Sequence, residues 1–197
     1  YQTLSTSNLP AVAIPDPSDH FDVITDTGAN ILTAAQSKFS NGLWWVKDIV
    51  NSNEHQLVDS LRGSSLAFNC PTCTSTTYSA PSGTSVAYCW KTPGNVVTTN
   101  DGSIASQVDA NTTSGFSIVE FTMGSGTQTV GHGLTQAPEF IVIKSKDSAA
   151  DFYTYTSIYG DNNYLALNTS NGNASGSWGG NSTSSVFSLT NTLAVSG

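Results

Sequence analysis

Residues 140–145 read FIVIKS, and residues 43–48 read LWWVKD. Both stretches are short apolar runs followed by a lysine, and the two lysines, Lys47 and Lys144, stand 97 positions apart. A short apolar run bounded by polar residues predicts a buried strand, and aromatic or β-branched side chains favour that assignment. A strand that occurs twice in one chain indicates an internal repeat.

Three further blocks occur twice and in the same order. They are DSLRG at 59–63 with TSIYG at 156–160, FDVI at 21–24 with FSIV at 116–119, and LAFN at 66–69 with LALN at 165–168. Their offsets are 97, 95 and 99, and the last requires a two-residue insertion at DNN, residues 161–163. Ordered blocks at a nearly constant offset predict two copies of one module.

The two copies also decide between helix and strand. HQLVDSLRG, residues 55–63, reads as a helix on its own, because its apolar residues share one side. Its partner FYTYTSIYG, residues 152–160, alternates Thr and Tyr, which favours a strand. Copies of one module share a conformation, so we predict strands in both. Further strands are predicted at TSVAYCWK (84–91), SSVFSL (184–189) and TLAV (192–195).

These patterns predict an all-β fold of two tandem antiparallel β-sandwich-like modules that arose by internal duplication. The predicted segments are an extended proline-containing arm at 1–20, the first module at 21–91, a linker or connecting strand at 92–114, and the second module at 115–197. Modules this small bury only about 60% of their unfolded surface, so we expect the two to pack against each other.

The second module is expected to lack its closing strand. In the first copy, the strand TSVAYCW follows Ser82-Gly83, whereas the second Ser-Gly pair is Ser196-Gly197, the last two residues of the sequence. Three explanations stay open. The parent polypeptide continues, a neighbouring subunit supplies the strand as in strand-addition assemblies, or the edge remains unpaired, which invites aggregation.

Charge and composition exclude several classes of partner. Charged residues make up 10% of the chain and the formal net charge is −8, so we expect no binding to nucleic acid. No apolar run approaches the roughly 18 residues of a membrane-spanning helix, so we expect no membrane insertion.

The residues that carry chemistry form no recognisable catalytic or metal-binding motif. The three histidines are His20, His55 and His132, and neither a GxSxG nor an HExxH motif occurs. His132, in GHGL, is predicted to be a turn residue whose imidazole bonds the local backbone. We predict no catalytic residue, no metal and no cofactor, and therefore a protein that is not an enzyme.

The cysteines give a structural prediction only. Cys70 and Cys73 lie in NCPTC, a lone CxxC with no second pair, and we interpret them as a turn that a small local disulfide could close. Cys89 lies within a predicted strand and is expected to act as a small core residue.

Aromatic residues are the more informative set. Trp44 and Trp45 are adjacent on a predicted strand, so one is expected in the core and the other in an intermodule or intersubunit contact. We consider both, together with Gly197, as candidate assembly contacts. A second candidate site is a sugar-stacking platform, with ordinary strand packing as the alternative interpretation. Its residues would be Tyr153, Tyr155, Tyr159 and Trp178.

Several of these blocks, in this order, resemble a repeated module of virion structural proteins of tailed, notably marine, bacteriophages. The resemblance rests on GFSIVEFT (115–122), QTVGHGLTQAPEFIVIKSKD (128–147), YLALNTS (164–170) and TSSVFSL (183–189). In those proteins the module occurs in tandem, and a strand like SVAYCWK commonly closes each copy. The resemblance implies a tail-fibre, appendage or capsid-surface component and brings no catalytic residues with it.

We therefore expect a non-enzymatic, self-assembling structural protein at the surface of a virus particle. Its expected partners are further copies of itself and other virion proteins, with host surface glycans as a further partner. The alternative functions are a carbohydrate-binding adhesin, a glycan depolymerase and a subunit of a cellular filament.

Overall fold

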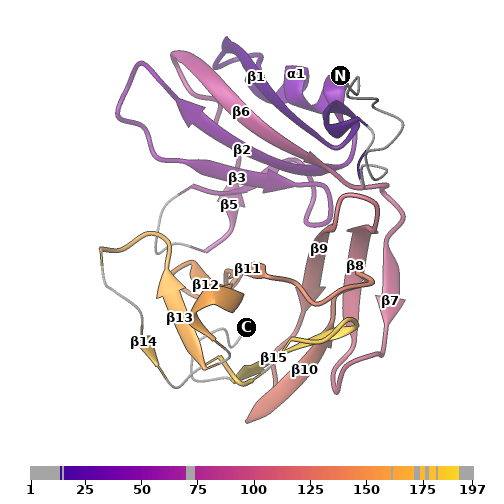
Figure 1. The fold of residues 1–197 in the computed structure, drawn as a ribbon. Helices are drawn as coiled ribbons and strands as arrows, with labels where there is room; N and C mark the ends of the chain where they lie inside the picture. Colours follow the sequence, from indigo (N-terminus) through magenta and orange to yellow (C-terminus); the bar gives the residue numbers. More distant parts are fainter. Residues whose placement is uncertain are drawn as a thin grey trace, which may run out of the picture.

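A computed structural model describes residues 14, 16–69, 74–160, 162–170, 174–175, 178–180 and 182–190. The chain is mostly β-structure, and every sheet in the described part is built from antiparallel pairs. The prediction of an all-β, sandwich-like fold is confirmed (Figure 1). The predicted strand TLAV and most of the arm at 1–20 lie outside the described residues.

The first module is a six-stranded sheet of order β1-β6-β2-β3-β4-β5. Its strands are β1 (Phe21–Thr27), β2 (Gly42–Asp48), β3 (Gln56–Asp59), β4 (Leu66–Phe68), β5 (Thr76–Thr77) and β6 (Thr84–Lys91). The last strand in sequence, β6, lies inside the sheet between β1 and β2 and is antiparallel to both. The predicted strand at 84–91 is therefore a central element of this module.

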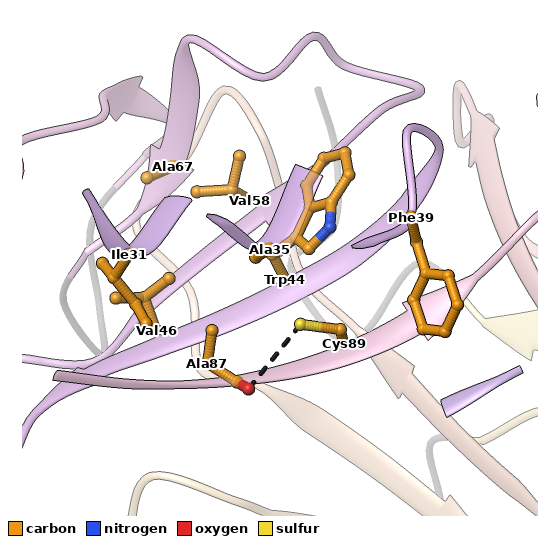
Figure 2. Close-up of a cluster of buried hydrophobic side chains, with 9 residues drawn as sticks. All are labelled: Ile31, Ala35, Phe39, Trp44, Val46, Val58, Ala67, Ala87 and Cys89. Atoms are coloured by element: carbon orange, nitrogen blue, oxygen red, sulfur yellow. Dashed lines mark hydrogen bonds between the residues drawn. The ribbon is translucent and has the colours of Figure 1, made fainter. Parts of the chain in front are cut away.

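A helix covers one face of this sheet. Helix α1 (Ile31–Lys38) places Ile31 and Ala35, which are one turn apart, against Trp44 of β2 and Cys89 of β6 (Figure 2). All four side chains are buried, and they form the centre of the first core. The sequence did not predict α1, because its apolar residues all lie within Ile31–Ala35 and give only a weak helical period over eight positions.

The second module contains two smaller sheets around its own core. Its strands are β9 (Phe116–Phe121), β10 (Thr127–Gly131), β11 (Phe140–Ile143), β12 (Tyr153–Thr156), β13 (Asn163–Ala166), β14 (Ala174–Ser175) and β15 (Val186–Thr190). The meander β11-β12-β13-β14 forms one sheet, and β10 pairs with β15. Buried side chains of β10 and β15 complete this core, among them Val130, Phe187 and Leu189. The β10–β15 pair thus packs against the meander, as α1 does in the first module.

The segment 92–114 is more than a linker. It forms β7 (Val97–Thr99) and β8 (Ser106–Asn111), which extend β9 into a three-stranded sheet of order β7-β8-β9. Its buried Asp109 accepts hydrogen bonds from the Thr92 hydroxyl at 2.6 Å and from the Gly94 N–H at 3.1 Å. The end of β6 is therefore fixed directly to the sheet that begins the second half of the chain.

The two modules pack against each other at several points. The rings of Trp90 and Phe116 stack with centroids 6.3 Å apart, and those of Phe68 and Phe152 meet edge to face at 6.1 Å. The Ser75 N–H also donates to the carbonyl of Lys146 at 2.9 Å. These contacts link the first module to β9 and to the segment between β11 and β12.

Both modules contain a four-strand meander, β2-β3-β4-β5 in the first and β11-β12-β13-β14 in the second, and the first three strands of each pair in the same register. In the first, Trp44 of β2 lies opposite Val58 of β3, and in the second, Ile141 of β11 lies opposite Tyr155 of β12. Each residue of the second pair is 97 positions after its counterpart. The pairing of β3 with β4 and of β12 with β13 keeps this offset, since Leu57 opposite Phe68 corresponds to Thr154 opposite Leu165.

The turns between these strands repeat as well. The Leu66 N–H donates to the carbonyl of Gly63, and the Asn163 N–H donates to the carbonyl of Gly160. Both glycines have positive φ, 102° and 78°. In addition, the ammonium of Lys47 donates to the carbonyl six positions later, and Lys144 does the same in its own module.

The strand pairing corrects one detail of the sequence alignment. The match of LAFN with LALN requires an offset of 99, whereas the paired residues keep an offset of 97 through β4 and β13. A two-residue shift preserves the inward and outward faces of a strand, because side chains alternate with a period of two. Apolar similarity alone could not separate the two alignments.

Candidate functional site

The clearest difference between the two meanders is what lies beside their first strand. In the first module β6 pairs with β2 along its whole length. In the second, β11 pairs with β12, and no described strand pairs with its other edge. The first strand of each module shows the same difference, because β1 pairs with β6, whereas β9 pairs with β8 on one edge and with no described strand on the other.

The hydrogen-bond pattern shows which backbone groups of β11 point to the open edge. In an antiparallel pair, successive residues direct their N–H and C=O groups alternately to one neighbour and to the other. The Ser157 N–H donates to the carbonyl of Glu139, so Glu139, Ile141 and Ile143 direct their groups toward β12. Phe140 and Val142 therefore direct theirs to the open edge.

The first module shows how such groups are used. There the Ser60 N–H donates to the carbonyl of Gly42, so Leu43 and Trp45 direct their backbone groups away from β3. These two residues pair with Trp90 and Tyr88 of β6. Leu43 and Trp45 are the counterparts of Phe140 and Val142 at the offset of 97. The groups that β6 satisfies in one module face a position that no described strand occupies in the other.

A cavity of about 930 Å³ lies along this position. All residues of β9 and all residues of β11 line it, and Leu43, Trp45 and Leu57 of the six-stranded sheet face it from the first module. In Figure 1, β9 and β11 lie below the six-stranded sheet, with β9 on the right of the view. The cavity is therefore bounded by both modules, and its walls are largely apolar.

Exposure of apolar side chains marks the same place. Phe140 is 60% exposed and Val142 is 38% exposed, although both belong to a strand. The neighbouring residue Ile143 is buried in the second core, as its alternation along β11 requires. One face of β11 is thus packed, and the other presents apolar side chains to the cavity.

Two pairs of opposite charge in the cavity wall neutralise each other. Arg62 donates from Nε to the carboxylate of Asp59 at 2.5 Å, with both side chains almost fully buried, and its guanidinium lies over the Phe68 ring. The ammonium of Lys146 donates to the carboxylate of Glu120 on β9. These four groups leave no net charge to select an ionic ligand.

Lys144 lies at the end of β11, beside the Phe68 and Phe152 rings. Burial lowers the pKa of its ammonium, and the nearby Asp151 carboxylate opposes this shift. Its donation to the Ala150 carbonyl matches that of Lys47 to Asn53. The contact therefore belongs to the repeated meander and gives Lys144 a structural role.

The adjacent tryptophans point to opposite faces of β2, as their spacing predicts. Trp44 is 1% exposed and lies in the first core, which is incompatible with an assembly contact. Trp45 faces the cavity, and its indole N–H donates to Nδ1 of His55 at 2.8 Å. Of the two, Trp45 is placed for contact with a partner that enters the cavity.

The structure contradicts the sugar-stacking platform. Trp178 is completely buried and stacks on Tyr155, which is also buried, with centroids 5.3 Å apart. Tyr153 packs edge to face on Tyr164, and Tyr159 lies in a 3-10 helix, η3 (Ser157–Tyr159), beyond the end of β12. The prediction is wrong for Trp178 and Tyr155, because no sugar can reach a ring inside the core, and the remaining tyrosines do not share one strand.

Gly197, the third candidate assembly contact, and Cys70 and Cys73, which could form a local disulfide, lie outside the described residues. Cys89 is a free, buried thiol in the first core, and burial raises its pKa to about 12. Its placement agrees with the expected role as a small core residue.

His132 has the structural role that the sequence suggested. It is buried, its Nδ1 accepts from the Leu134 N–H at 3.1 Å, and its Nε2 donates to the Thr183 carbonyl at 3.1 Å. Burial lowers the pKa of this imidazole, so the ring stays neutral at physiological pH. Both nitrogens are engaged in fixing the backbone.

The described part of the chain contains neither a metal-binding cluster nor a membrane-spanning helix. No group of three or more His, Cys, Asp or Glu side chains there is placed to hold a metal ion. Among the same residues, no helix has the length and apolarity required to cross a membrane.

The sequence pointed to the open strand position but not to the residues that line it. The signal was that TSVAYCWK is not one of the sequence blocks that occur twice. The exposure of Phe140 and Val142 could not be predicted, because FIVI is apolar at every position. Its sequence therefore does not distinguish the packed face of the strand from the exposed one.

Comparison with known proteins gives one match. A family model described as a domain of unknown function (DUF7483) matches residues 69–197, which include β6 and the whole of the second module. None of the curated proteins and none of the solved structures compared with the chain matches it.

Proposed function

We propose that this chain, which belongs to the DUF7483 family of domains of unknown function, is a non-enzymatic structural protein of a tailed-bacteriophage particle. It is built into a tail fibre, an appendage or the capsid surface, and its partners are further copies of itself and other proteins of the particle. Contacts between polypeptide surfaces, rather than a reactive centre, carry this function.

The observation that carries the proposal is the open strand position between β9 and β11, with its apolar walls. Unpaired strand edges readily accept another polypeptide, which is why proteins usually protect them. The low content of charged residues, 10%, agrees with a surface that associates by shape and backbone pairing. The resemblance of several sequence blocks, in their order, to a module of phage virion proteins supports the particle as the setting.

Sedimentation velocity tests this role. The chain is measured over a range of concentrations, alone and mixed with the other structural proteins of the particle that carries its gene. We expect association, and we expect Val142→Asp to weaken it, because the substitution places a charge at an apolar strand edge. A chain that stays monomeric and binds none of these proteins contradicts the proposal.

Ile158→Asp is the matched control. Ile158 is also apolar and is 87% exposed, but it lies in η3, outside the cavity walls. The same charge at this position should leave the association unchanged. Equal weakening by both substitutions would mean that general surface apolarity, rather than the strand position, drives assembly.

A further inference from the structure

We infer that the cavity between β9 and β11 binds an extended strand donated by a neighbouring protein chain, in the position that β6 holds between β1 and β2. This inference rests on the proposed function, because it names the partner segment of the same assembly surface. The bound strand runs antiparallel to both β9 and β11. Its backbone groups pair with those of Phe140 and Val142.

The register follows from the first module. Trp90 of β6 lies between Phe21 of β1 and Leu43 of β2. The counterparts of these two neighbours are Phe116, at the offset of 95, and Phe140, at the offset of 97. One residue of the donated strand therefore lies between Phe116 and Phe140. Both of these residues line the cavity.

The surroundings define the side chains of the donor. One face of the bound strand packs toward the second core, beside Ile141 and Ile143. The opposite face meets Leu43, Trp45 and Leu57 of the first module. Because both faces are covered, the donor is apolar on both sides at its centre, as expected for a strand buried on two faces. Arg62 and Lys146 of the cavity wall are already paired with carboxylates, so they do not select a donor strand with charged side chains.

The β6 sequence supplies a direct probe. A fluorescently labelled peptide with the sequence of residues 84–91, carrying Cys89→Ala to prevent disulfide formation, is titrated against the intact chain, with anisotropy as the readout. We expect saturable binding of this peptide and not of a peptide with the same composition in scrambled order. Alternating side chains would then set specificity, as in other strand additions.

The variant Val142→Pro tests the backbone pairing. Proline removes the N–H that faces the open edge and leaves the hydrogen bonds between β11 and β12 in place, since Ile141 and Ile143 make those. We expect about tenfold weaker peptide binding, the effect of one lost hydrogen bond in a closed site. The control Val142→Thr keeps the N–H and the β-branched shape and should bind within about twofold of the parent chain.

Hydrogen exchange provides a readout that does not depend on the probe's fluorescence. The amides of Phe140 and Val142 should exchange rapidly in the free chain and slowly with the peptide bound. The inference fails if the ordered and scrambled peptides bind equally, if neither binds, or if Val142→Pro binds as tightly as Val142→Thr. Near-ultraviolet circular dichroism establishes that the variants are folded.

The outcomes separate this inference from the proposed function. Association with particle proteins that the β6 peptide does not inhibit would retain the structural role and overturn the strand acceptor. Specific peptide binding by a chain that joins no assembly would retain the strand acceptor and overturn the structural role.

Discussion

In the first module β6 lies between β1 and β2, whereas the corresponding place between β9 and β11 holds no described strand. Around this difference the first three strands of the two meanders pair in the same register. The meanders also share their turn glycines and a lysine whose ammonium donates to the carbonyl six residues later. A duplicated unit has therefore kept its internal pairing while one of its strand positions is open. The shared meander does not require the neighbouring strand to define its register.

The largest contrast between the modules is expected at one pair of counterpart residues. Trp44→Ala should lower the free energy of unfolding by about 3–5 kcal/mol, because a fully buried indole is lost from the first core. The counterpart Ile141→Ala should cost about 1–2 kcal/mol, since Ile141 is only partly buried beside the open position.

Urea titrations of both variants measure these changes. Equal losses would mean that the second core is as tightly packed around Ile141 as the first is around Trp44. The two modules would then not differ in how tightly their cores are packed.

A second pair tests whether the turns are true counterparts. Gly63→Ala and Gly160→Ala should each cost about 1–2 kcal/mol, because both glycines have positive φ and an added Cβ meets open space or no contact closer than 3.9 Å. The cost arises from the backbone alone, so the two changes in the free energy of unfolding should agree. A large cost at one glycine only would break the correspondence of the turns.

A third pair predicts a difference in acid sensitivity. Asp48 accepts from the Asn51 N–H at 2.9 Å, and its counterpart Ser145 accepts from the Ser148 N–H at 3.1 Å. Hydrogen bonds from Asn51 hold the pKa of Asp48 well below its usual range, and those from Val50 and Asn53 act in the same direction.

Because the pKa of Asp48 is lower in the folded state, its stabilisation is complete above the unfolded value of about 3.9 and is lost as the pH falls through and below that value. Thermal unfolding between neutral pH and pH 3 should therefore show a smaller acid-induced fall in Tm for Asp48→Ser than for the parent chain. An identical fall would show that other carboxylates dominate the acid response.

The smallest expected effect concerns the thiol of Cys89 in β6, the strand that has no counterpart among the described residues of the second module. With its pKa raised to about 12 by burial, Cys89 should remain unmodified by iodoacetamide in the native protein at pH 8. Mass spectrometry of the peptide that contains Cys89 measures this after a short exposure. Rapid labelling under native conditions would indicate that β6 leaves its place between β1 and β2.

The sequence predicted several strands of both meanders, because the repeated blocks include the turn glycines as well as the apolar runs, but its alignment of β4 with β13 was two residues off. Gly63 and Gly160 fix where each hairpin reverses, and residues counted from them fall on corresponding pairs. A turn that requires positive φ can be recognised in the sequence, because glycine adopts this conformation without steric cost.

Other features of the fold could not be recognised from the sequence. The segment that covers the core is a helix at Ile31–Lys38 in one module and a strand at Thr127–Gly131 in the other. Either structure covers an apolar face, so the repeat did not determine which would form. Trp178 lies near several glycines, and its burial depends on Tyr155, which is distant in sequence, so local composition suggested an exposed loop.

The open strand position occurs in one module and not in the other, and this has a geometric consequence for the proposed assembly. Where the donor of the strand is a further copy of this chain, the donor segment and the acceptor site are different surfaces, so each contact joins two unlike surfaces. Repeated contacts of this kind join subunits head to tail, and they give a closed ring when the rotation per subunit divides a full turn and an open filament when it does not. Such a polymer has two unlike ends, and only one of them exposes a vacant acceptor for the next subunit.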